Sequence, residues 1–125
     1  MSEQTTDRVF TIDGFIKEGA ERTVVRTYQD EDLVTLVEWV DPGKEFEAPH
    51  WHPQAAHVFI FTAGEGEALV GNGRWQSVRA GQFLVNPRNK VHAIRNTGSE
   101  RLVWACVHVT HGLPYVVNKA GQEHE

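Results

Sequence analysis

Residues 43–64 read GKEFEAPHWHPQAAHVFIFTAG, and they place His50, His52 and His57 within eight residues. Side chains two apart on an extended strand point to the same face, so His50 and His52 are expected side by side. His57 then opens the run HVFIF, which predicts a second strand. Because imidazole is the commonest metal ligand among side chains, this stretch predicts a metal site.

A second stretch, residues 81–96, reads GQFLVNPRNKVHAIRN and carries His92. If His57 and His92 lie on neighbouring strands, about 5 Å apart, they can reach the same ion as the other two histidines. The two stretches together therefore predict four ligands for one ion.

The spacing of these residues resembles the two motifs of the cupin superfamily. The first family motif is a glycine, five residues, HxH, three or four residues, a glutamate, six residues and a glycine. The second is a glycine, five residues, PxG, two residues, a histidine, three residues and an asparagine. The corresponding positions of this sequence are Gly43, His50, His52, His57 and Gly64, followed by Gly81, Pro87, Asn89, His92 and Asn96, with six residues between Gly43 and His50.

Two positions depart from the family pattern. His57 stands where the family has glutamate, and Asn89 stands where the second motif has glycine. Asparagine tolerates the left-handed conformation that glycine usually fills, so the second change is mild. The resemblance thus implies one divalent metal ion held by His50, His52, His57 and His92. Four neutral ligands leave such an ion its full charge, and the spacing does not choose among zinc, iron, manganese and nickel.

The chain alternates short β-type runs with turns, and no segment shows sustained helical periodicity. We expect an all-β protein, and the resemblance implies a cupin-type antiparallel jelly-roll β-barrel. A single domain is expected over residues 1–125, with residues 1–8 flexible. The predicted strands lie at 22–28, 33–40, on both sides of residues 52–56, and at 67–70, 74–78, 83–85, 92–95 and 101–109, with an edge strand and turn at 9–16 and a further strand at 114–117.

Alternation also predicts what lines the barrel. Phe59 and Phe61 share the parity of His57, and Ile94 shares that of His92. In the last long strand, one parity includes Trp104, Cys106 and His108 and the other consists of valines and an alanine, and the sequence does not say which faces inward. These five positions outside the ligand set are the pocket candidates: Phe59, Phe61, Ile94, Trp104 and Cys106.

Catalytic assignments from sequence are weak. His108 is a candidate acid or base, although such a residue is more often structural. Glu38 is a candidate base if it points inward. Arg88 and Lys90 are rim charges for an anionic substrate or, more simply, solvated loop charges. His111 and His124 are interpreted as solvated.

The composition of the chain indicates which kinds of partner it can bind. The 125 residues are 40% hydrophobic and 23% charged with a net charge of -5, which argues against a nucleic-acid-binding face. The polar N-terminus and the lack of an apolar run near ~20 residues predict a cytoplasmic protein with no membrane contact. Both parities of several strands are apolar, so we expect the outer face to be covered, most simply by a second subunit or by the N-terminal strand. The resemblance favours a homodimer.

Three functions fit this reading. The first is an enzyme in which the metal acts as a Lewis acid on an oxygen-rich small molecule, such as an enolisable carbonyl or a polyketide-like compound, in a cyclase, isomerase or lyase reaction. The second is an iron or manganese dioxygenase of a diketone, enol or aromatic compound. The third is a non-enzymatic small-molecule-binding protein in which the metal stabilises the barrel.

Overall fold

The computed structural model describes residues 9–17, 22–51, 56–70, 73–87, 92–109 and 118–119, with side chains not described for 22–23, 47–51 and 118–119. Within these ranges the regular elements are one short 3-10 helix and ten strands. In chain order they are η2 (Ile12–Phe15), β1 (Arg22–Gln29), β2 (Leu33–Val40), β3 (Glu45–Trp51), β4 (Ala56–Ala63), β5 (Glu65–Leu69), β6 (Trp75–Arg79), β7 (Phe83–Asn86), β8 (His92–Arg95), β9 (Leu102–Val109) and β10 (Asn118–Lys119).

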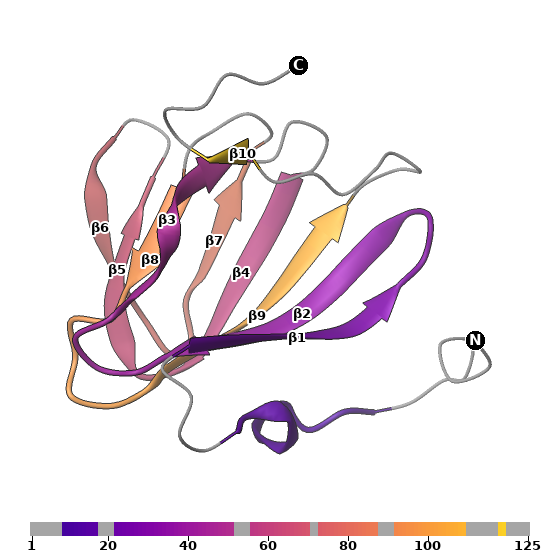
Figure 1. The fold of residues 1–125 in the computed structure, drawn as a ribbon, viewed down its shortest axis with the longest axis horizontal. Helices are drawn as coiled ribbons and strands as arrows, with labels where there is room; N and C mark the ends of the chain where they lie inside the picture. Colours follow the sequence, from indigo (N-terminus) through magenta and orange to yellow (C-terminus); the bar gives the residue numbers. More distant parts are fainter. Residues whose placement is uncertain are drawn as a thin grey trace.

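The strands form two antiparallel five-stranded sheets. One sheet has the order β1-β2-β9-β4-β7, and the other has the order β10-β3-β8-β5-β6. Figure 1 shows the second group on the left and the first group continuing to the right. Most sequence neighbours that are not joined by a hairpin lie in different sheets, as in a jelly roll. The predicted all-β class and antiparallel barrel are confirmed.

The pairing of β4 with β9 determines what faces the interior. In register, His57 lies opposite His108, Phe59 opposite Cys106, and Phe61 opposite Trp104. All six side chains are buried, with at most 4% of their surface exposed. The sequence left the parity of β9 open, and the structure places the Trp104, Cys106 and His108 parity inside.

The core below the histidines is apolar and joins both sheets. Phe46 of β3 packs edge-on against Trp104, with ring centroids 5.0 Å apart, and Ile94 of β8 belongs to the same cluster. Each large side chain buried in this way contributes about 1.5–3 kcal/mol relative to its exposed state. The indole Nε1 of Trp104 donates a hydrogen bond of 2.5 Å to Glu38, so this buried carboxylate is also satisfied.

The outer face of the first sheet has a second apolar cluster. Val37, Trp39 and Val103 are buried there, and Ile12 and Phe15 of the N-terminal segment pack against them. Figure 1 shows this segment beneath β1 and β2. Of the two expected covers for this face, a second subunit or the N-terminal segment, the structure shows the N-terminal segment in place. The predicted edge strand at 9–16 is wrong. Residues 12–15 form a 3-10 helix, in which Ile12 and Phe15, three residues apart, lie on the same side.

The ends of the two motifs are tied together. The Gly43 amide donates to the Asn96 carbonyl at 3.1 Å, and the Asn96 amide donates to the Lys44 carbonyl at 2.9 Å. At the other two ends, the Ala80 amide donates to Gly64 at 3.1 Å and the Gly81 amide donates to Phe61 at 2.9 Å. All four motif ends therefore gather at one end of the barrel, and the histidine-bearing ends of the strands lie at the other.

The motif glycines and asparagine have structural reasons. Gly43, Gly64 and Gly81 have φ of 80–92°, which favours glycine. A Cβ at Gly64 would also collide with the Arg101 carbonyl oxygen. The buried Asn96 side chain donates to the carbonyls of Val40 and Glu100, at 2.9 and 2.8 Å, and accepts from the Gly98 amide at 2.8 Å. Asn96 thus holds the turn before β9 against the end of β2.

Most other predicted strands match to within two residues, and those at 33–40 and 92–95 have the predicted bounds. The strand expected at 114–117 and the flexible segment at 1–8 lie outside the described residues. Over the described part of the chain, no helix has the length and apolar character needed to cross a bilayer.

Candidate metal centre

Two of the four predicted ligands meet between the sheets. His57 begins the inward face of β4 and His92 begins β8, and each is 2% exposed. Their ring centroids lie 4.3 Å apart with the planes at 69°. The expectation that they lie on neighbouring strands is wrong, because β8 pairs with β3 and β5 while β4 pairs with β7 and β9. The two histidines face each other across the interior, so an ion bound by both would join the sheets.

Strand β9 brings two further groups to His57. The His108 ring stacks on His57 with centroids 4.3 Å apart and planes at 26°. The Cys106 Sγ lies 3.1 Å from Nε2 of His108 and 3.9 Å from Nδ1 of His57. Both residues are at most 2% exposed. His108 was a weak catalytic candidate and Cys106 a pocket candidate in the sequence, and the structure places both at the predicted ligand His57.

For the other two predicted ligands, the structure describes only the backbone of His50. His50 lies on β3 directly opposite His92 in the antiparallel register, which puts its backbone beside that ligand. Its side chain is not described, and His52, Arg88, Lys90, His111 and His124 lie outside the described residues. The four-histidine ligand set therefore stays a prediction.

The donor chemistry suits a metal ion. Among the described side chains, His57, Cys106 and His108 have their donor atoms within 4.8 Å of one another. Imidazole and thiol donors match zinc, iron, copper and nickel, whereas magnesium and calcium prefer oxygen. The residues present thus fit a transition-metal ion of the kind that the sequence resemblance implies.

Burial controls the protonation of the cysteine. Removal from water raises the pKa of the Cys106 thiol well above its usual value, and the negative charge of Glu38 raises it further. The neutral thiol is therefore the stable form in the absence of metal.

The remaining pocket candidates divide into two layers. Phe59 packs edge-on against His57 and His92, with centroids 5.0 and 5.7 Å away, and forms the apolar wall next to them. Phe61, Ile94 and Trp104 belong to the core cluster. Glu38 faces inward, as a pocket base must, and lies opposite Trp104 in the β2–β9 register. Trp104 is four residues before His108 on β9, which separates Glu38 from His108 by roughly 13 Å along the strand. Its contact with Trp104 makes it a structural group of the barrel floor.

Asn86 is a residue that the sequence analysis missed. It lies opposite His57 in the β4–β7 register and is 2% exposed. Its side-chain Nδ2 makes no hydrogen bond within the described part of the chain. A polar residue that ends the apolar run FLV just before Pro87 is the signal that could have identified it.

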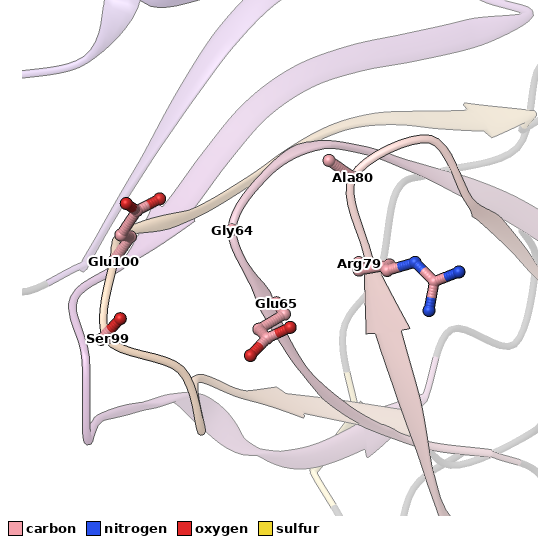
Figure 2. A pocket seen from close by; sticks show the side chains of 6 residues that line it. All are labelled: Gly64, Glu65, Arg79, Ala80, Ser99 and Glu100. Carbon is pink, nitrogen blue, oxygen red and sulfur yellow. The ribbon is translucent and has the colours of Figure 1, made fainter.

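An open pocket lies at the opposite end of the barrel from the histidines. Figure 2 shows its lining by the turn after β4, the end of β6 and the residues before β9. Its volume is about 360 Å³. The lining residues are Gly64, Glu65, Arg79, Ala80, Ser99 and Glu100. None of them lies next to the histidine cluster, so the chemistry that His57 and His92 offer is not available there.

Comparison with protein families matches residues 36–108, more than half of the chain, to the cupin domain family. The chain belongs to the cupin family. No curated protein sequence matches this cupin.

Solved structures agree in fold. This cupin is similar to an uncharacterized conserved protein with a double-stranded β-helix domain from Klebsiella pneumoniae subsp. pneumoniae MGH 78578, at 24% identity and a TM-score of 0.80, covering 91% of this chain and 99% of that one. It is similar to a recombinant oxalate oxidase in complex with glycolate at 20% identity, TM-score 0.64 and coverages of 79% and 55%. It is also similar to a predicted oxalate decarboxylase from Thermotoga maritima, at 19% identity and a TM-score of 0.65, covering 71% of this chain and 80% of that one.

The raised pKa of Cys106 predicts a pH dependence of stability in metal-free protein. The folded state holds the thiol proton more tightly than the unfolded state, whose cysteine pKa is about 8.5. The contribution of Cys106 to stability is present below that value and is lost as the pH rises above it, by at most about 1.4 kcal/mol per pH unit. Urea unfolding measures the free energy of unfolding of wild type and Cys106→Ala at pH 7 and pH 10. Between these two pH values the wild type should lose more stability than the variant.

A difference between the two proteins that is the same at both pH values would contradict the raised pKa. Full-length chain treated with a chelator is used for both, because a bound ion would displace the proton and mask the effect.

Proposed function

We propose that this cupin is a metal-dependent enzyme acting on an oxygen-rich small molecule, with His50, His52, His57 and His92 holding one divalent ion. The observation that carries the proposal is the approach of His57 and His92. Two fully buried imidazoles from opposite sheets lie with centroids 4.3 Å apart. An ion bound by one nitrogen of each ring would hold the two histidines, and with them the two sheets, together.

The strand register supports the other two ligands. His50 lies opposite His92 on β3. His52 follows two residues later, so an extended chain gives it the same face as His50. The motif would then supply two ligands from β3 and its continuation, one from β4 and one from β8.

The ion, when bound, supplies a Lewis acid that polarises a substrate carbonyl. The chain's own residues determine what can reach it. Phe59 forms an apolar wall beside the two histidines, and the core cluster fills the barrel below, so the substrate binds at the histidine end. A cyclase, isomerase or lyase acting on an enolisable carbonyl or polyketide-like compound fits this arrangement.

The structural neighbours support an oxygen-rich substrate. An oxalate oxidase in complex with glycolate and a predicted oxalate decarboxylase share the fold, and their names refer to small oxygen-rich acids. Because one of these neighbours is an oxidase, an iron or manganese dioxygenase of a diketone, enol or aromatic compound is the second candidate. Turnover of enolisable carbonyl compounds under strict exclusion of oxygen supports Lewis-acid chemistry, and turnover that requires oxygen supports the dioxygenase. A metal-stabilised binding protein would bind such compounds without converting them.

Replacing His57 tests the metal assignment. His57→Ala removes one ligand and should weaken metal binding on the order of 100-fold or more, since even changes to groups behind a ligand cost about 10–100-fold. His57→Glu restores the usual family ligand and should keep the metal, because a carboxylate oxygen is also a ligand for these ions. Metal content after dialysis and calorimetric titration measure both effects.

The glutamate variant is the matched control for loss of the ring. If His57→Ala binds metal as tightly as the wild type, His57 is not a ligand and the four-histidine set is wrong. If His57→Glu keeps the metal but loses turnover, reduced charge on the ion is the cause, as Lewis-acid chemistry requires.

A homodimer is also part of this proposal. On the outer face of β4 and β7, Ile60 and Phe83 lie opposite each other in register and are 43% and 69% exposed. Val85 beside them is 53% exposed. Exposed apolar groups that adjoin in this way mark interaction surfaces, and a second copy would bury them.

Light scattering tests the dimer. The wild-type protein should have the mass of two chains, and Phe83→Asp should reduce it to one. Gln29→Asp, an exposed position on β1 at the opposite edge of the same sheet, adds the same charge away from this surface and should leave the mass unchanged. A wild-type mass of one chain contradicts the homodimer.

A further inference from the structure

We propose that β9 contributes sulfur to the metal site: Cys106 and His108, together with His57, form a donor set for a thiophilic divalent ion such as zinc or cobalt. The cupin motifs assign no ligand to this strand. The inference rests on the proposed function in one respect, that the interior at His57 holds an ion. Cys106 and His108 would take the place of two of the proposed histidine ligands, so that the ion keeps four protein ligands.

The strand geometry directs all three groups to one point. Cys106 and His108 are two residues apart on β9, so both point inward. The β4–β9 register places His57 directly opposite His108. The three side chains are 1–2% exposed, so water does not compete for the donor atoms.

The distances match those of a shared ion. A tetrahedral zinc ion, with bonds of about 2.3 Å to sulfur and 2.0–2.1 Å to nitrogen, sets its sulfur and nitrogen ligands roughly 3.6 Å apart. The Cys106 Sγ lies 3.1 Å from one imidazole nitrogen and 3.9 Å from the other, on either side of that value. Small rotations of the two rings would equalise them.

Charge gives a reason for a sulfur ligand at this place. The chain has His57 where the family has glutamate, which removes the carboxylate that would offset part of the ion's charge. A divalent ion inside an apolar barrel is costly without an anionic partner. When the metal–sulfur bond forms, the thiol proton leaves to solvent and Cys106 becomes the missing anion. The Nδ1 of His57 already faces this sulfur.

Cobalt titration of the chelator-treated full chain tests the inference. A cobalt–thiolate bond produces strong charge-transfer absorption in the near ultraviolet, which cobalt bound only to histidine lacks. Since Cys106 is the one cysteine of the sequence, this absorption can come from no other residue. We expect one cobalt per chain with the thiolate absorption.

Variants on β9 provide the controls. Cys106→Ala should abolish the absorption, and His108→Gln should weaken cobalt binding about tenfold or more. Val107→Ala, between them on the same strand and on the opposite face, should leave the absorption and affinity unchanged. A melting curve of each metal-free variant establishes that it folds, and if Cys106→Ala does not, the wild-type spectrum alone decides.

The outcomes separate this inference from the proposed function. Cobalt bound without thiolate absorption overturns the sulfur ligand and leaves the histidine site standing, with Cys106 only hydrogen-bonded to His108. No cobalt bound by the wild-type protein overturns both. Thiolate absorption that survives in Cys106→Ala overturns the assignment to Cys106.

Discussion

The register between β4 and β9 is the constraint on which the interior of this cupin depends. It sets His57 against His108, Phe59 against Cys106 and Phe61 against Trp104, in that order down the barrel. The polar end of this series collects the imidazoles and the thiol, and the apolar end fills the core. A shift of β4 by one residue would turn His57, Phe59 and Phe61 to the outer face, so the site and the core are specified together.

The two sheets meet at this polar end through His57 and His92. At the opposite end, backbone hydrogen bonds from Gly43 to Asn96 and from Ala80 to Gly64 hold the motif ends together. The backbone thus fixes the motif glycines and Asn96 at one end of the barrel, and the described histidines lie at the other. A metal ion bound by His57 and His92 would join the two sheets at the histidine end.

Local sequence pattern was enough to predict the strands and the inward positions of Phe59, Phe61 and Ile94, since alternation is a property of one strand at a time. It failed where contacts depend on how strands assemble. The opposition of His57 and His92 across the interior follows from sheet closure, and the meeting of His57 with Cys106 follows from a register between segments about fifty residues apart. The error at residues 9–16 is local, because the three-residue spacing of Ile12 and Phe15 puts them on one side of a 3-10 turn and on opposite sides of a strand.

The acidic groups near His57 determine how much negative charge the site can offer. His57 stands where the family motif has glutamate, so an ion bound there would lack the charge of that carboxylate. Glu38 lies too far down the barrel to replace it as a ligand. Cys106 is the described acidic group that lies against His57, and burial raises its pKa, which keeps the thiol neutral in the metal-free protein.

The central claim is that one ion joins the two sheets through His57 and His92. Anomalous X-ray scattering from a crystal grown with zinc tests it most directly, because it locates the ion independently of any assumed ligand. The account predicts one peak between the sheets, within about 2.0–2.2 Å of a nitrogen of each of these two histidines. A peak bound to only one of them, or lying at the Glu65 and Glu100 end of the barrel, would contradict it.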